Sequence, residues 1–138
     1  MDVKLFEFNK KYGFHDTAIT GIHFFDGRLS ISFLNGIYLL NGNGKEINLT
    51  RECCMTLITD KSLCTAEDNV SICFYKKNRR KLIPFMSFEK MLNKNKFEIL
   101  FDYYSHFARS ILFRGYVGKY SVDFIVENIK AVELDFVE

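Results

Sequence analysis

The chain has 138 residues, of which 48% are hydrophobic, 16% aromatic and 26% charged. This balance is typical of a single globular domain over residues 1–138 and excludes a disordered or fibrous chain. The net charge of +2 excludes a strong overall attraction to polyanions.

The N-terminal segment 1–8 contains acidic residues and has no apolar core, so we do not expect a signal peptide. No later apolar run approaches the about 18 residues that span a bilayer. We therefore expect a cytoplasmic protein with no membrane contact. Its four cysteines should stay reduced there, and their spacing predicts no metal site; they are Cys53, Cys54, Cys64 and Cys73.

The first clear element is a hairpin around Asp26-Gly27, preceded by His15-Asp16. With a two-residue loop, Phe24 pairs with Leu29 and Ile22 with Ile31, so one face is apolar throughout. A His beside an Asp can serve acid–base chemistry. Adjacent residues on an extended chain point apart, however, so a turn is the simpler interpretation.

The next segment alternates with a period of two and is interrupted by turn residues. Asn35-Gly36 predicts either a tight turn or a bulge, and residues 41–44 predict a turn. After them a further strand is expected to carry one apolar face, broken only by Arg51; this face is formed by Ile47, Leu49, Cys53, Met55 and Leu57. Cys64 is the cysteine that we expect to be exposed.

A strand over Val70–Phe74 is followed by a run of five cations in six residues. We interpret this run as a basic loop at 76–81; its cations are Lys76, Lys77, Arg79, Arg80 and Lys81. Ser87 is a suitable N-cap, and Phe88, Met91 and Leu92 share a helical face. The pattern therefore predicts one short helix near 88–94.

Strands return at Phe97, where alternation places Phe101 and Tyr103 on the same face as Phe97. The loop Gly118-Lys119 then predicts a second hairpin. In its register Phe113 faces Phe124, and Arg114 faces Asp123 as a cross-strand ion pair. A last strand covers residues 132–136. The chain as a whole predicts a mainly β fold, an antiparallel β-sandwich or curled sheet of about eight to ten short strands, with α+β as the variant.

Two groups of short motifs carry a resemblance. The first comprises Phe14-His15-Asp16, the Asp26-Gly27 hairpin and the segment 33–37; the second comprises Ser87-Phe88-Glu89, Phe97-Glu98-Ile99, the segment 102–105 and Arg114-Gly115-Tyr116. Together they resemble small bacterial β-rich proteins of unknown function, some of which are similar to the immunity proteins that neutralise toxins. The resemblance covers roughly half the chain and implies no activity, cofactor or catalytic residue.

The candidate binding residues cluster near the end of the strand that begins at Phe97. They are Asp102, Tyr103, Tyr104 and His106, joined by Tyr116 of the last hairpin. Tyrosine offers a large rigid surface with a polar tip, which suits protein recognition. We expect a non-enzymatic protein-interaction module with a protein partner and no cofactor, and self-association is left open. A small enzyme or ligand binder with a cleft near Asp102–His106 is the alternative.

Nucleic-acid binding through the basic loop is the third hypothesis. Residues 76–119 carry a net charge of +8 and residues 120–138 a net charge of −4. If the acidic C-terminal segment lies against the basic one, the outward field is weak. We therefore expect no useful affinity for nucleic acid.

Overall fold

The computed structural model describes residues 4–60 and 65–137, which form a mainly β structure with three antiparallel sheets and two short α-helices. The predicted fold class is confirmed. Thirteen strands are present in the described residues. The number exceeds the prediction partly because two-residue pairings such as β1 and β2 are too short to leave a periodic pattern.

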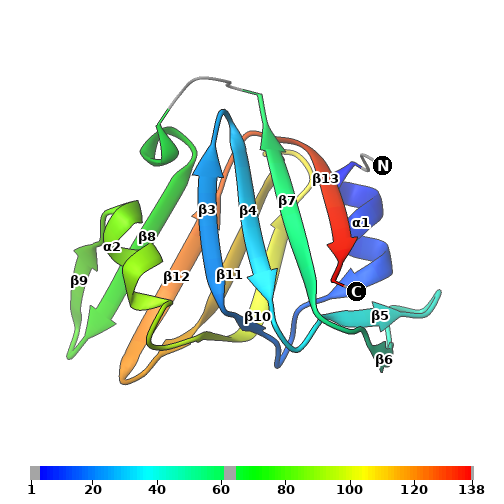
Figure 1. Ribbon diagram of the computed structural model, residues 1–138, viewed down its shortest axis with the longest axis horizontal. Coiled ribbons are helices and arrows are strands. Elements are labelled where there is room, and N and C mark those ends of the chain that lie inside the picture. Colours follow the sequence, from blue (N-terminus) through cyan, green and yellow to red (C-terminus); the bar gives the residue numbers. More distant parts are fainter. Residues whose placement is uncertain (1–3, 61–64, 138) are drawn as a thin grey trace.

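A six-stranded sheet forms one layer of the molecule (Figure 1). Its order is β2-β10-β11-β12-β8-β9. The bounds are β2 Ala18–Ile19, β8 Val70–Lys76, β9 Arg79–Leu82, β10 Phe97–Ser105, β11 Ser110–Val117 and β12 Tyr120–Val126.

A four-stranded sheet lies in front of it in the order β13-β7-β4-β3 (Figure 1). Its bounds are β3 Gly21–Phe25, β4 Arg28–Phe33, β7 Cys53–Thr59 and β13 Ile129–Phe136. A small third sheet, β1-β5-β6, extends from one corner and comprises β1 Tyr12–Gly13, β5 Tyr38–Leu40 and β6 Glu46–Leu49. The helices are α1 Leu5–Lys11 and α2 Phe85–Met91, with a 3₁₀ turn, η1, at Ala66–Asp68.

The core consists of phenylalanines and aliphatic residues from both large sheets. Six phenylalanines are almost completely excluded from solvent: Phe14, Phe33, Phe88, Phe97, Phe113 and Phe124. Phe14 joins the layers, because its ring centroid lies 5.6 Å from that of Phe33 in β4 and 5.2 Å from that of Phe113 in β11. Each buried aromatic side chain removes about 150–250 Å² from water, so these rings dominate the stabilisation of the fold.

Both predicted hairpins have the expected register. Ile22 pairs with Ile31 and Phe24 with Leu29 in the first, while Phe113 pairs with Phe124 in the second. Asn35-Gly36 forms a turn and not a bulge, since the Gly36 N–H donates to the carbonyl oxygen of Phe33 over 3.1 Å. Turn residues and alternation therefore predicted these local structures correctly.

Three predictions about the elements are wrong. The helix begins at Phe85 after Pro84 and ends at Met91, so Ser87 is inside it and not its N-cap. The α1 helix was missed because only Leu5 and Phe8 mark its buried face. The apolar face expected to run from Ile47 to Leu57 is divided: β6 exposes Ile47 and Leu49, while β7 is buried. Arg51 lies at the break between them.

The predicted alternation of β10 also fails beyond Ile99, because the register with β11 shifts there. Ile99 pairs with Gly115, but Phe101 pairs with Arg114, so Leu100 is an extra bulged residue. One inserted residue exchanges the faces of everything that follows. Phe101 and Tyr103 consequently face away from the core, whereas Asp102 and Tyr104 are turned toward the inner side and are partly buried.

Gly115 permits the close approach of the two strands at this bulge. A Cβ atom added at Gly115 would lie 1.8 Å from the carbonyl oxygen of Glu98, which is a backbone atom and cannot rotate away. The register of β10 against β11 therefore requires glycine at this position.

We predict that Gly115→Ala destabilises the fold by about 1–3 kcal/mol, the usual cost of forcing atoms into a packed site. Gly21→Ala in β3 is the matched control, because its added Cβ meets no atom closer than 3.8 Å. The control should be neutral or slightly stabilising. Urea unfolding of both variants measures the difference, and equal midpoints would show that β10 and β11 separate at little cost.

Candidate functional site: the outer face of the six-stranded sheet

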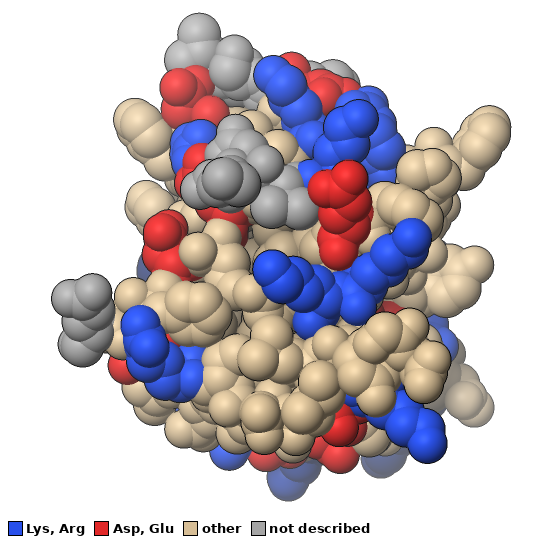
Figure 2. All heavy atoms as spheres, turned by 90° about the vertical axis from the view of Figure 1, so that its right-hand side faces the viewer, with Lys and Arg blue, Asp and Glu red and all other residues tan. Residues whose placement is uncertain are grey.

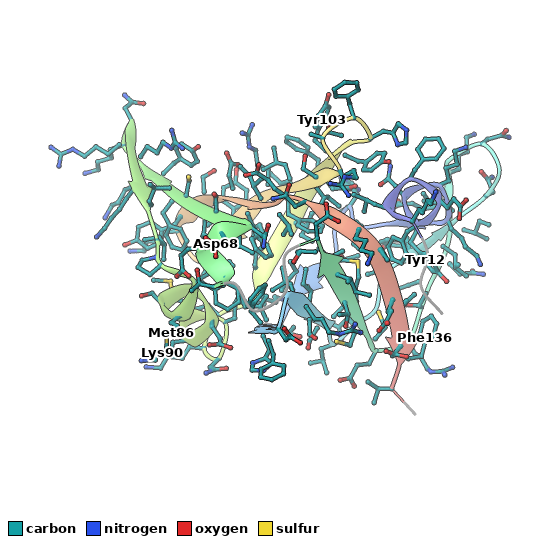
Figure 3. The ribbon with its side chains drawn as sticks, turned by 90° about the horizontal axis from the view of Figure 1, so that it is seen from above. Tyr12, Asp68, Met86, Lys90, Tyr103 and Phe136 are labelled. Carbon is teal, nitrogen blue, oxygen red and sulfur yellow. The ribbon has the colours of Figure 1, made fainter. Side chains whose placement is uncertain are left out.

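The six-stranded sheet has an outer face, which is the side turned away from the four-stranded sheet. Strand register assigns to it Cys73, Tyr75, Arg80, Leu82, Phe101, Tyr103, Leu112, Arg114, Tyr116, Asp123 and Ile125. Viewed from above, Tyr103 points away from the rest of the molecule (Figure 3). No described helix or strand packs over this face (Figures 1 and 3).

A charged network lies at the centre of the outer face. The Arg114 guanidinium donates two hydrogen bonds to the Asp123 carboxylate, with Nε–Oδ1 at 2.6 Å and Nη2–Oδ2 at 2.9 Å. The Tyr75 hydroxyl donates to Asp123 Oδ2 over 3.0 Å. The predicted cross-strand ion pair is therefore present, and a bidentate geometry makes it stronger than a single contact.

The network sets the protonation of its members. Arg114 holds the pKa of Asp123 below its usual range, even though the Asp123 side chain is only 7% exposed. Burial, followed by the hydrogen bond to Asp123, raises the pKa of Tyr75. The Arg114 guanidinium also lies 5.5 Å from the centre of the Phe101 ring. A carboxylate, a phenol and a guanidinium are thus fixed in one arrangement with their charges satisfied internally.

Exposed apolar side chains surround this network. Tyr103 is 65% exposed and Leu82 equally so, while Phe101 and Tyr116 are each exposed by about two fifths. Leu112 and Ile125, which pair across β11 and β12, are partly buried. An exposed apolar surface of this kind is typical of an interaction site.

The five candidate residues near residues 102–116 do not form one site. Tyr103 and Tyr116 lie on the outer face, whereas the bulge places Asp102 and Tyr104 on the opposite side of β10. His106 follows the strand and approaches α1, where its ring centroid is 4.7 Å from that of Phe6. Asp102 and His106 therefore line two separate pockets and not one shared cleft.

Asp102 lines a pocket of about 570 Å³ beside β1 and β5, together with His15 and Glu46. Burial raises the pKa of Asp102, and the nearby His15 opposes that rise. Sequence reasoning did not associate these two residues, because 87 positions separate them and only the fold brings them close.

His15 and Asp16 occupy a turn, as predicted. The Thr17 N–H donates to the carbonyl oxygen of Phe14 over 3.0 Å, and Asp16 has a φ of 61°. The His15 side chain is more than half exposed, and its Nδ1 lies 3.3 Å from the Asp16 carboxylate.

Tyr104 and His106 line a second pocket, of about 490 Å³, with Phe6 and Phe107. The Tyr104 hydroxyl lies 3.1 Å from Nδ1 of His106, within hydrogen-bonding distance. Burial raises the pKa of Tyr104. The arrangement brings one phenol and one imidazole together but supplies no third group to orient them as a catalytic unit.

The three cysteines of the described residues are free thiols. Cys53 and Cys73 are buried, Cys54 is half-buried, and all three are free. Burial raises the pKa of Cys53 and of Cys54, which disfavours the thiolate. Cys64, expected to be exposed, lies outside the described residues. Among the residues described, no three His, Cys, Asp or Glu side chains gather to hold a metal ion.

The basic run is a hairpin and not a loop. Lys76 ends β8, Lys77 and Asn78 form a two-residue turn with positive φ, and Arg79–Leu82 is the edge strand β9. Lysines and arginines on an edge strand discourage pairing with a second sheet.

The acidic residues of 120–138 were expected to lie against the basic segment 76–119, and in the described residues this is true only in part. Glu133 pairs with Arg28, and β13 is the edge strand of the other sheet, at the opposite end of the molecule from β9 (Figure 1). At that end acidic and basic side chains are interspersed (Figure 2). Of the five C-terminal acids, Asp123 does pair with the basic segment, through Arg114.

Comparisons with known proteins identify no relative: no family model, no curated protein and no solved structure matches the chain. The helices of the described residues are all too short or too polar to cross a membrane.

We predict that Arg114→Met costs about 1–3 kcal/mol of stability at pH 7, because it leaves the buried Asp123 carboxylate without its cation. The double variant Arg114→Met/Asp123→Val should cost less than the single variant, since no buried charge remains. Urea melts of the two proteins test this. A double variant that is the less stable of the two would show that the ion pair itself stabilises the fold.

We also predict that Asp102→Asn stabilises the protein at neutral pH. Because the folded-state pKa of Asp102 is raised, ionisation of this carboxyl opposes folding above that pKa. The gain should disappear as the pH falls below the unfolded value of about 3.9, where the carboxyl is protonated in both states. Urea midpoints across this pH range measure the effect, with Glu98→Gln on the same strand as control. A gain that persists at acid pH would exclude ionisation as its cause.

Proposed function

We propose that the chain is a non-enzymatic protein-interaction module that binds a partner protein through the outer face. The observation that carries this proposal is a continuous sheet surface on which Phe101, Tyr103 and Tyr116 remain exposed around the Arg114–Asp123 pair. Aromatic residues and arginine are enriched in protein interfaces.

The rigidity of the outer face supports this function. Its side chains project from hydrogen-bonded strands, and the network of Tyr75, Arg114 and Asp123 fixes their surroundings. A preorganised surface loses little conformational entropy when a partner binds. Tyrosine adds a large contact area with few rotatable bonds.

The charge of the outer face indicates the chemistry of the partner. Because Arg114 and Asp123 neutralise each other, the face does not demand a strongly charged partner. An apolar and aromatic surface with hydrogen-bonding groups at its rim would complement it, and binding should depend only weakly on salt. An immunity-like role, in which the partner is a toxin, is the specific form of this proposal that the resemblance suggests.

The test compares proteins captured from cells that make this chain. The tagged parent is used beside Tyr103→Ser/Tyr116→Ser and a control, Phe25→Ser, which removes an exposed ring from the other sheet. We predict that at least one protein is captured by both the parent and the control. The double variant should capture about tenfold less of it, or less still. Its capture should be similar at about 50 and 300 mM salt.

Thermal melts first establish that all three proteins are folded. We expect them to be, because the substituted side chains are exposed. Sedimentation velocity of the parent alone tests whether the partner is a second copy of the chain. The proposal fails when the parent sediments as a monomer and the double variant captures every protein as well as the parent does.

A further inference from the structure

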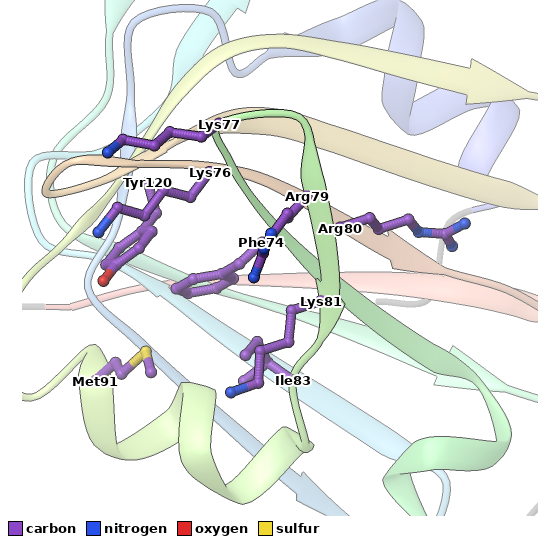
Figure 4. A pocket seen from close by; sticks show the side chains of 9 residues that line it. All are labelled: Phe74, Lys76, Lys77, Arg79, Arg80, Lys81, Ile83, Met91 and Tyr120. Atoms are coloured by element: carbon purple, nitrogen blue, oxygen red, sulfur yellow. The ribbon is translucent and has the colours of Figure 1, made fainter.

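The basic hairpin forms one wall of a groove of about 890 Å³, the largest of the pockets described here. Cross-strand register pairs Lys76 with Arg79 and Phe74 with Lys81, so these four residues share one side of the hairpin. That side faces α2 and the start of β12, where Met91 and Tyr120 complete the groove (Figure 4). Arg80 pairs with Tyr75; it also lines the groove, but its side chain extends away from the other lining residues (Figure 4).

The floor of the groove is aromatic. Phe74 is 6% exposed, and its ring centroid lies 5.4 Å from that of Tyr120, which is 38% exposed. Ile83 and Met91 add apolar walls. Tyr120 therefore offers a ring surface to a planar group that enters the groove.

Three cations of the groove have no salt-bridge partner within the described residues. No carboxylate there lies within 4.0 Å of Lys76, Arg79 or Lys81. The Lys76 ammonium lies over the face of the Tyr120 ring, 5.6 Å from the ring centre. Three like charges around an apolar floor repel one another and focus a positive potential into the groove, which an anion would relieve.

The volume, the cations and the aromatic ring of the groove together indicate which class of ligand it would bind. The volume lies within the about 300–1,000 Å³ typical of small-ligand sites. An exposed aromatic ring beside clustered Lys and Arg fits a planar base attached to phosphate, since bases stack on such rings and phosphates pair with such cations. We propose that the groove binds a nucleotide, with its base against Tyr120 and its phosphates among Lys76, Arg79 and Lys81.

The same chemistry is offered by a free nucleotide and by one unit of a single-stranded nucleic acid. An acidic peptide could satisfy the cations but has no planar base for Tyr120. The proposal reverses the expectation of weak polyanion binding. That expectation depended on the acidic side chains of residues 120–138, but Asp123 pairs with Arg114 and Glu133 with Arg28, and neither pairs with a cation of the groove.

The experiment titrates the full chain with ATP, inorganic triphosphate, a labelled single-stranded RNA of mixed sequence and polyglutamate. We expect dissociation constants of about 100 μM or tighter for ATP or the RNA at low salt, weakening steeply as salt rises. Binding to ATP but not more tightly to the RNA would assign a free nucleotide, and a preference for the RNA would assign a nucleic acid.

Two variants test the residues. Arg79→Ser/Lys81→Ser should weaken nucleotide binding about tenfold or more and reduce its salt dependence. The control Lys45→Ser/Lys130→Ser loses the same charge from exposed positions outside the groove and should bind like the parent. Tyr120→Leu should weaken ATP and RNA but leave inorganic triphosphate unchanged, because only the base contacts the ring.

Thermal melts verify that each variant is folded. The proposal is overturned by absence of binding to ATP and RNA, by equal losses in the control, or by tight polyglutamate binding that is insensitive to Tyr120. This test is separate from the test of the proposed function, because the two surfaces differ. Tyr103→Ser/Tyr116→Ser alters the outer face only and should retain nucleotide binding.

Discussion

The close approach of β10 and β11 at Gly115 determines which surfaces this molecule presents. No side chain fits between Gly115 and the Glu98 carbonyl, and directly beyond this point Leu100 is inserted as a bulge. The insertion exchanges the two faces of β10, so Phe101 and Tyr103 leave the core side. A regular strand would have buried these rings and exposed Asp102. The exposure of Phe101 and Tyr103 on the outer face therefore depends on this bulge, which lies directly beyond Gly115.

The aromatic residues of the two large sheets fall into two groups, buried rings that stabilise the core and exposed rings on the outer face. Phe14 connects the layers through Phe33 and Phe113, and the remaining core rings pack around them. The outer face keeps its rings exposed around an ion pair that is already neutral. Neutral pairing matters here, because a buried carboxylate without Arg114 would oppose both folding and docking.

Strand β8 separates two surfaces of different chemistry. Its alternate residues send Tyr75 to the outer face and Phe74 to the groove. The outer face is aromatic with its central charges paired, which suits a protein partner. The groove combines an aromatic floor with unneutralised cations, which suits an anion. Salt dependence distinguishes the two kinds of binding, since screening acts on the groove far more than on the outer face.

The sequence by itself determined the local structure wherever turn chemistry and alternation agree: the Asp26-Gly27 and Gly118-Lys119 hairpins, their registers, and the Arg114–Asp123 pair. Only the tertiary structure decided the rest. The bulge at Leu100 arises from pairing with β11, which alternation along one strand cannot reveal. The proximity of His15 to Asp102 and the distance between the basic hairpin and β13 depend on sheet order. Sheet order follows from packing between residues far apart in the chain, and local patterns carry no record of it.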